Sequence, residues 1–226
     1  MKNISLRTSP DYKIWFISDL HLGHAKDFIL NPRKYTSVKE AYEHTFQMLQ
    51  DNIGINDIVI NLGDAVVGAQ ERTVEYAKRM VHIPCQKHYY IWGNHNAGMQ
   101  NLYDDCRRDL GLLADDVDIY PLNYPQTNFY FMGNRMEISI DGTSLILDHY
   151  PIASWNHIGK GSFMIHGHCH RNLKEDSSLK RLDISWDWKK RPVEWKEIQA
   201  ELGGRVFKAI DHHGNDEVNS QFFEKP

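Results

Sequence analysis

Short apolar segments alternate with amphipathic segments through the first hundred residues of the chain. The segments 12–18, 57–62 and 87–92 are apolar and rich in β-branched or aromatic residues, which predicts buried strands. The segment 38–52 has one apolar face at helical spacing, and 71–81 ends shortly before a proline, so we expect a helix over each. The order strand, helix, strand, helix, strand predicts a parallel sheet with crossover helices.

The pattern changes after about residue 117, where short apolar segments follow one another without helices between them. The pairs Gly133–Asn134 and Asp141–Gly142 predict tight hairpin turns. We therefore expect an antiparallel meander that forms a second sheet, followed by a late helix over 192–202. Its strands are expected over 129–132, 135–140, 143–147, 163–165 and 181–185.

A chain of 226 residues with 41% hydrophobic and 25% charged residues has the composition of an ordinary globular protein. We expect one domain over 1–226, with its core over about 12–203 and a polar C-terminal extension over 204–226. Two sheets packed face to face with helices outside predict an α/β sandwich flanked by helices. No apolar run approaches the ~20 residues that a membrane-spanning helix requires, so a membrane partner is not expected.

Charge and cysteine content narrow the expected environment and partners. The net charge of −4 disfavours a protein that binds long nucleic acid by neutralising phosphates. Three cysteines, Cys85, Cys106 and Cys169, form no disulfide framework, and the first seven residues lack the apolar stretch of a signal peptide. We expect a cytoplasmic protein, and the sequence leaves the oligomeric state open.

Thirteen histidines are present, and several of them stand with carboxylates and one amide at predicted junctions between strand and loop. The carboxyl ends of strands in open α/β sheets meet at one edge, so these side chains are expected to converge there. Residues two apart in an extended segment project to the same face, which applies to the pairs 19 and 21, and 168 and 170. The candidates are Asp19, His21, Asp64, Asn94, His95, His149, His168 and His170.

This set offers imidazole nitrogens and carboxylate or amide oxygens, a mixture that suits Mn²⁺, Fe or Zn²⁺. These candidates exceed the needs of one ion, whereas two ions sharing a bridging carboxylate account for seven ligands. Two-metal sites with ions ~3.5–4 Å apart serve in-line displacement at phosphorus. The sequence therefore predicts a dinuclear hydrolase centre.

The ordered motifs Asp19-x-His21, Gly63-Asp64, Gly93-Asn94-His95, His149 and Gly167-His168-x-His170 resemble the signature blocks of the calcineurin-like metallophosphoesterases. The segments 17–24, 149–151 and 166–170 are most similar to the small prokaryotic and phage branch. The resemblance implies that family's fold, a four-layer αββα sandwich. Because no Asp-Arg-Gly follows Gly63-Asp64, the phosphoprotein-phosphatase branch is not expected.

The resemblance also implies a role for each candidate. One metal ion would be held by Asp19, His21 and His170, and the other by Asn94, His149 and His168. Asp64 would bridge both ions together with a metal-bound hydroxide, and His95 would stabilise the phosphoryl group or protonate the leaving oxygen. Mn²⁺ is the favoured ion, with Fe, Zn²⁺ or Ni²⁺ as alternatives.

Asn96 stands where the family often has an acid that orients the catalytic histidine, which weakens the expected acid role of His95. His24 is expected either to contact the substrate phosphate or a ligand, or to be a loop histidine bonded to backbone. His166 is expected to support the ligands, and Trp155 to line the cleft or to belong to the core. The basic segment 171–191 and its two tryptophans would attract anions and stack a base if they faced the cleft. An ordinary solvated loop with core tryptophans is the favoured interpretation.

The expected function is hydrolysis of a phosphomonoester or phosphodiester, with a small, nucleotide-type substrate favoured. The first alternative is a nuclease acting on DNA or RNA. The second is a non-catalytic scaffold that keeps the fold and uses it for protein interaction. Such a scaffold would usually lose ligand residues, whereas all seven positions are filled in this sequence.

Overall fold

The computed structural model describes all residues except 1–3, 69–70, 113–117, 175 and 207–226. A six-stranded sheet has the order β11-β2-β3-β4-β6-β5. Its four central strands run parallel: β2 (Ile14–Ile17), β3 (Ile58–Asn61), β4 (Lys87–Tyr90) and β6 (Phe129–Phe131). The antiparallel edge strands are β5 (Leu122–Asn123) and β11 (Val193–Glu194). Helices α2 (Val38–Asn52) and α3 (Glu71–Val81) connect β2 to β3 and β3 to β4, which confirms the predicted parallel half.

A second sheet has five strands in the order β1-β7-β8-β9-β10. They are β1 (Ile4–Leu6), β7 (Arg135–Ile140), β8 (Thr143–Asp148), β9 (Phe163–His166) and β10 (Arg181–Asp183). Only β7 and β8 pair antiparallel, whereas the other three pairings are parallel. The predicted antiparallel meander is therefore wrong except for the hairpin at Asp141–Gly142, which joins β7 to β8. The edge strand β1 also lies ahead of the core boundary expected at residue 12.

The predicted hairpin at Gly133–Asn134 is wrong. The strand before these residues, β6, pairs with β4 of the six-stranded sheet, whereas β7 after them belongs to the other sheet. Trp92 donates a backbone hydrogen bond to Gly133, which fixes this segment as it leaves the first sheet. The glycine and asparagine therefore carry the chain between sheets, because β6 finds a longer-range partner than its neighbour in sequence.

The strands distribute their side chains between three apolar clusters. In β2, Ile14 and Phe16 point into the cluster between the two sheets, whereas Trp15 and Ile17 point to the outer face with α2 and α3. The same alternation places Ile146 of β8 in a third, smaller cluster on the outer face of the five-stranded sheet. Strands β2 and β3 of the six-stranded sheet are thus buried on both faces, which explains their continuous apolar segments, whereas β7 of the other sheet alternates between buried residues and exposed or half-buried ones.

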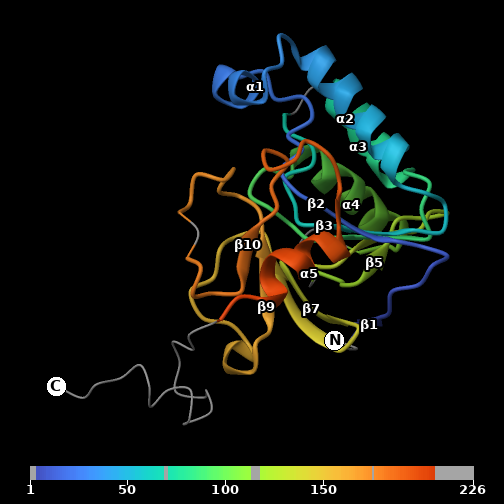
Figure 1. Ribbon diagram of the computed structural model, residues 1–226. Helices are drawn as coiled ribbons and strands as arrows, with labels where there is room; N and C mark the ends of the chain where they lie inside the picture. Colours follow the sequence, from blue (N-terminus) through green and yellow to red (C-terminus); the bar gives the residue numbers. More distant parts are fainter. Residues whose placement is uncertain (1–3, 69–70, 113–117, 175, 207–226) are drawn as a thin grey trace.

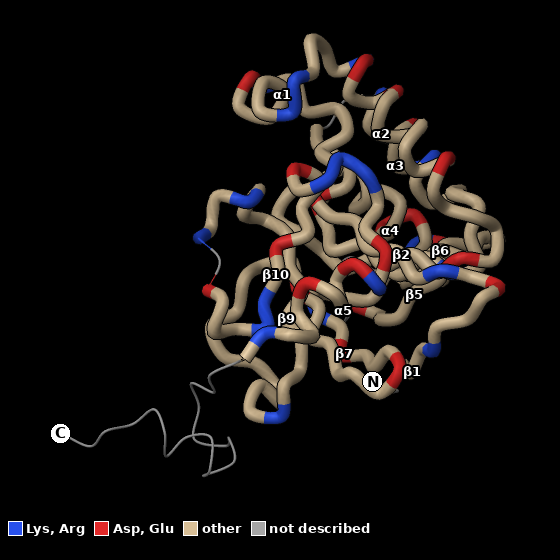
Figure 2. Tube along the Cα trace, viewed as in Figure 1, with Lys and Arg blue, Asp and Glu red and all other residues tan. Residues whose placement is uncertain are grey.

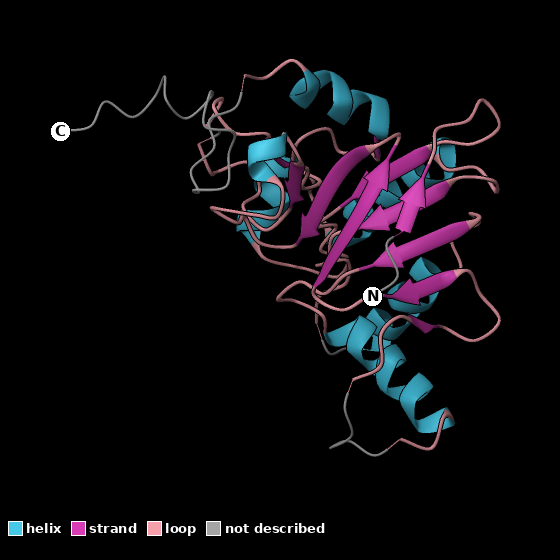
Figure 3. Ribbon diagram, turned by 90° about the horizontal axis from the view of Figure 1, so that it is seen from below, coloured by secondary structure: helices cyan, strands magenta, loops and turns pink. Residues whose placement is uncertain are grey.

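Helices lie on both sides of the paired sheets, as Figure 3 shows. Two of them were not predicted: α1 (Asp27–Arg33) and α4 (Ala97–Asp109). The late helix α5 (Trp195–Gly203) begins after the predicted start at 192, because Val193 and Glu194 first pair with β2. A single 3₁₀ turn, η1 (Ile158–Lys160), packs on the outer face of the five-stranded sheet.

The predicted α/β fold, a two-sheet sandwich flanked by helices, is confirmed. Most of the expected C-terminal extension over 204–226 lies outside the described residues. No helix among the described residues is long and apolar enough to cross a bilayer.

Candidate metal centre

The loops after β2, β3 and β4 lie side by side at the carboxyl edge of the six-stranded sheet (Figure 1). Backbone hydrogen bonds continue from the strands into these loops: Asp19 donates to Gly63 at 3.0 Å and His21 donates to Asp64 at 2.9 Å. This pairing brings together two carboxylates that are 45 residues apart in sequence, as expected from the strand order.

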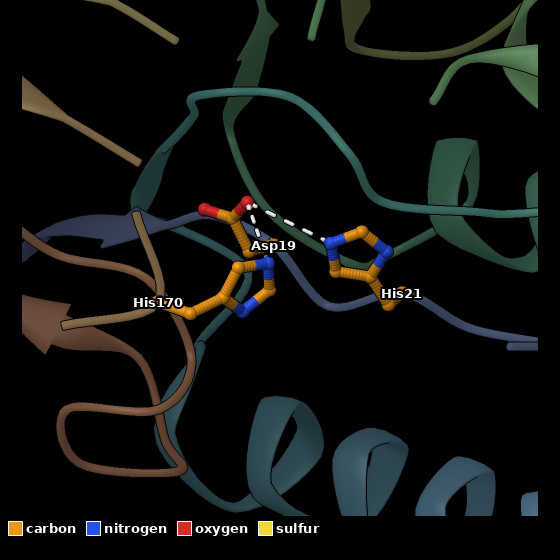
Figure 4. A group of neighbouring side chains, drawn as sticks. All are labelled: Asp19, His21 and His170. Carbon is orange, nitrogen blue, oxygen red and sulfur yellow. Dashed lines mark ion pairs between the residues drawn. The ribbon is translucent and has the colours of Figure 1, made fainter. Parts of the chain in front are cut away.

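Asp19 lies between two imidazoles, those of His21 and His170, which are far apart in sequence. Its Oδ1 is 3.7 Å from Nε2 of His21 and 3.8 Å from Nε2 of His170. Figure 4 shows both rings turned toward this one carboxylate oxygen. The three donors lie within 4.8 Å of one another, so they form a group that could hold a metal ion.

Asp64 faces histidines of both expected metal positions. Its Oδ2 is 3.7 Å from Nε2 of His21 and 3.4 Å from Nε2 of His149. Burial alone would raise the pKa of this carboxyl, but the hydrogen bond and charge of His149, with the amide of His95, lower it to about 2. A carboxylate that remains ionised between two histidines has the chemistry of a bridging ligand.

Asn94, His149 and His168 converge next to Asp64. The amide oxygen of Asn94 is 3.0 Å from Nε2 of His149 and 2.8 Å from Nδ1 of His168. His149 Nδ1 lies 2.8 Å from the carbonyl oxygen of Leu62, which fits a tautomer that donates there and keeps the Nε2 lone pair for another partner. The three side chains therefore offer one oxygen and two nitrogens to a second position.

Five of the seven candidate ligands have a left-handed backbone. The φ angles of Asp19, His21, Asp64, His168 and His170 lie between 48° and 67°. Such conformations cost free energy in residues other than glycine and cluster at functional sites. The sequence thus keeps a strained backbone at the positions that aim these side chains.

Two glycines make room for the carboxylates. A Cβ on Gly93 would lie 2.0 Å from Oδ1 of Asp64, and one on Gly167 would lie 2.2 Å from Oδ2 of Asp19. No larger residue fits at either position without displacing a carboxylate. In each of the motifs Gly93-Asn94 and Gly167-His168, the second residue is a candidate ligand. The glycine before it leaves space for the carboxylate of Asp64 or Asp19.

The donor set fits the divalent metal ions expected from the sequence. His21 is buried, and neither of its ring nitrogens has a hydrogen-bond partner among the described residues. Its Nε2 is too far from both carboxylates for a hydrogen bond. Two ligand atoms each ~2.1 Å from a shared ion lie ~3.4 Å apart in tetrahedral geometry, so these separations suit ligands of one cation.

Comparison with known proteins agrees with this geometry. The sequence profile described as calcineurin-like phosphoesterase matches residues 12–226. The chain belongs to the calcineurin-like phosphoesterase family. Members of this family normally use a centre of two divalent metal ions, and the side-chain groups around Asp19 and Asp64 supply possible ligands for them. Metal-dependent hydrolysis of phosphoester bonds is thus the general chemistry of this chain.

Two individual relatives are distant. The Gene 66 protein of Mycobacterium phage D29 is 27% identical over an alignment of 173 residues, and the match covers 71% of this chain and 79% of that protein. A protein of unknown function from Aquifex aeolicus, AQ665, has a crystal structure that covers 84% of this chain and 98% of its own. The TM-score is 0.59 at 19% identity, so this likeness shows the fold alone.

The phosphoesterase also has a buried ion pair that sequence reasoning missed. The carboxylate of Asp187 lies 2.7 Å from Nδ1 of His170, and Arg33 donates to both of its oxygens. Burial would raise the pKa of Asp187, but His170 and Arg33 hold it well below its usual range. A carboxylate behind a ligand histidine fixes the ring and makes it more basic. The one feature of the sequence that could have indicated this ion pair is the position of Asp187, an acid close to the basic residues 189–191.

His95 lies at the rim of this phosphoesterase site with an exposed side chain. Its backbone N–H donates to Oδ1 of Asp64 at 2.8 Å, and its ring is 5.6 Å from that of His21, centroid to centroid. Asn96, which stands where the family often has an orienting acid, bonds the backbone of its own turn. Its amide bonds the backbone of Gly93 at both ends and accepts from Tyr90, which ties down the Asn94–His95 turn.

His24 and His166 lie in different surroundings. His24 lies beside the centre, with its ring 5.6 Å from that of His21. Burial is the largest of the causes that lower the pKa of His24 to about 4. His166 is fully buried, has Nδ1 2.8 Å from the carbonyl oxygen of Gly167, and stands in a separate group with Cys169 and Asp183.

Other residues near the ligand motifs contact the protein itself. Asp148 is paired with Arg135 at 2.9 Å, and Trp155 is buried in the outer apolar cluster rather than lining a cleft. Trp186 is buried, and Trp188 lies under the guanidinium of Arg171. Lys189 and Arg191 donate to the carboxylate of Glu197, and Lys190 donates to the carbonyl oxygen of Arg33.

Proposed function

We propose that this phosphoesterase binds two divalent metal ions and hydrolyses a phosphomonoester or phosphodiester. The favoured substrate is small and of nucleotide type. The first ion would be held by Asp19, His21 and His170, and the second by Asn94, His149 and His168, with Asp64 between them. The observation that carries this assignment is the position of Asp64 Oδ2, 3.7 Å from His21 and 3.4 Å from His149.

When bound, two divalent cations neutralise phosphate charge and lower the pKa of water at neutral pH. The chain supplies the remaining functions. Its buried carboxylates and histidines hold the ions at fixed positions on paired loops. His95 would donate a proton to the leaving oxygen, because its backbone is anchored to Asp64 and its exposed ring lies beside that of His21.

The mixed nitrogen and oxygen donors favour Mn²⁺, with Fe, Zn²⁺ or Ni²⁺ as alternatives. A cytoplasmic location fits the three free cysteines, of which Cys85 and Cys106 are buried with a raised thiol pKa. The net charge of −4 argues against a nuclease that follows long nucleic acid. Figure 2 shows both signs of charge interleaved along the described trace, in keeping with a small substrate.

The first test is metal content and activity of the metal-depleted protein after addition of Mn²⁺. We expect hydrolysis of p-nitrophenyl phosphate or bis(p-nitrophenyl) phosphate to return with two equivalents of metal. The replacement Asp64→Ala should remove most of both ions, whereas His82→Ala, an exposed histidine at the end of α3, serves as the matched control. Two equivalents retained by Asp64→Ala would contradict the ligand assignment.

The second test separates an enzyme from a scaffold. His95→Asn should keep both metals and lose most turnover, with a smaller loss for esters whose leaving group needs no proton. Equal losses for good and poor leaving groups would contradict the acid role. Absence of all hydrolysis from the metal-loaded protein would favour the scaffold. Cleavage of labelled oligonucleotides in preference to mononucleotides would favour the nuclease.

A further inference from the structure

Two exposed aromatic rings touch histidines of the proposed centre. Six large hydrophobic side chains are exposed among the described residues, and only two of them, Phe28 and Tyr150, are aromatic. Phe28 is 69% exposed with its ring 5.1 Å from that of His24, and Tyr150 is 46% exposed with its ring 4.6 Å from that of His168. Exposed apolar surface at a binding site commonly marks the area that a ligand covers.

The two rings approach the centre from different ligand groups. His24 stands against His21, so Phe28 belongs to the side of the first proposed ion. Tyr150 is in ring contact with both His149 and His168, which belong to the side of the second proposed ion. The two exposed aromatic rings therefore lie next to the proposed centre, one beside each group of proposed ligands.

Both rings are held on fixed parts of the chain. Tyr150 donates its backbone N–H to Oδ1 of Asp148 at 2.9 Å, directly after the ligand position His149. Phe28 belongs to the first turn of α1, and the last turn of that helix is tied to the metal loop, because Arg33 donates to the carbonyl oxygens of Asp19 and Leu20. Rigid support of this kind lets a side chain bind without a large ordering cost.

We propose that Phe28 and Tyr150 are stacking surfaces for the two nucleobases of a dinucleotide whose phosphodiester lies at the metal centre. Base stacking on aromatic rings needs no net positive charge, which agrees with a chain of net charge −4 whose cations at 189–191 are engaged by the protein itself. The inference rests on the proposed function and extends it to a substrate class, nucleoside phosphodiesters with a base on each side.

The test compares two diesters on the Mn²⁺-loaded full-length protein. Thymidylyl-(3′→5′)-thymidine carries two bases, and methyl p-nitrophenyl phosphate carries none. Phe28→Ala and Tyr150→Ala should each lower the ratio of kcat/KM for the dinucleotide to that for the methyl ester about tenfold, mainly through KM. The double variant should lose about a hundredfold, since the two stacking sites act independently.

Conservative variants and a remote control make the result specific. Tyr150→Phe and Phe28→Tyr should restore the ratio, because each keeps the π face. Leu110→Ala, which truncates an exposed apolar residue at the end of α4, should leave the ratio as it is. A proportional loss on both diesters would overturn the proposal and assign Tyr150 to the support of His168.

The remaining outcomes separate this inference from the proposed function. If the wild type hydrolyses the methyl ester but the alanine variants keep the full dinucleotide ratio, stacking is overturned and phosphoester hydrolysis stands. If only one of the two alanine variants lowers the ratio, the proposal that both nucleobases are stacked is overturned. If the metal-loaded wild type hydrolyses neither diester nor p-nitrophenyl phosphate, the proposed function fails and this inference fails with it.

Discussion

Arg33 donates two hydrogen bonds to Asp187, from Nε to Oδ1 at 3.0 Å and from Nη2 to Oδ2 at 2.7 Å. The same guanidinium donates to the carbonyl oxygens of Asp19 and Leu20, and the same carboxylate contacts His170. One ion pair therefore joins α1, the loop after β2 and the last ligand motif. Arg33 and Asp187 are not proposed ligands themselves. They fix the positions of two proposed ligands, Asp19 and His170.

Replacing Asp187 by Asn should weaken metal binding without unfolding the protein. The amide keeps the shape of the carboxylate but loses the charge that orients His170 and raises its basicity. Partners of this kind typically change metal affinity by about 10- to 100-fold. Titration of the metal-depleted protein with Mn²⁺ measures the effect. Asp176→Asn, an exposed acid in the same loop region, is the matched control and should bind as the wild type does.

Replacing Arg33 by Met should lower the free energy of unfolding by about 3 kcal/mol, because a largely buried carboxylate loses its cation. The loss should be smaller when Asp187 is already Asn, with a coupling of about 1 kcal/mol or more. Urea denaturation of the wild type, both single variants and the double variant gives this cycle. Additive losses would show that the two residues act separately.

Gly93→Ala should abolish binding of at least one metal ion. The added Cβ would stand 2.0 Å from Oδ1 of Asp64, and the backbone nitrogen of the same residue is only 2.8 Å away, so the carboxylate must move. Metal analysis after dialysis is the measurement. Gly203→Ala at the end of α5, where a Cβ meets no atom within 4 Å, provides the control. Full metal content in Gly93→Ala would contradict the placement of Asp64 as a ligand.

Local patterns were enough to predict the strands that build the site. Strands β2, β3 and β4 are continuous apolar segments that end at polar motifs, and parallel pairing then brings those motifs to one edge. The pairing of β6 with β4 rather than with β7 could not be predicted in this way. A glycine and an asparagine between two short strands look like a hairpin, and only the packing of distant segments decides otherwise.

The candidate ligands could be named from residue type and position, whereas their supports could not. Asp187 is 17 residues beyond His170, and Arg33 lies in a helix that the apolar pattern did not predict. Nothing in the sequence near either residue marks the other as its partner. The ion pair exists because α1 folds back over the loop after β2, and this contact is a property of tertiary structure.

His88 is a buried histidine outside the ligand motifs. It lies in β4 with 1% of its surface exposed, and its ring packs on Phe129 at 4.6 Å between centroids. Neither ring nitrogen has a hydrogen-bond partner among the described residues. Burial lowers the pKa of His88 to about 3, so the ring is neutral in the folded protein at physiological pH.

The folded protein should therefore lose stability as the pH falls from about 6.5 toward 3. In that window the unfolded chain binds a proton at His88 and the folded chain does not, so acid favours unfolding by up to about 1.4 kcal/mol per pH unit. His88→Leu, which keeps an apolar side chain of similar volume, should remove this slope, whereas His82→Leu at an exposed position should retain it. Urea denaturation at pH 6.5, 5.5 and 4.5 measures the three slopes. If the curves of wild type and His88→Leu run parallel, His88 is not the group that carries this acid sensitivity.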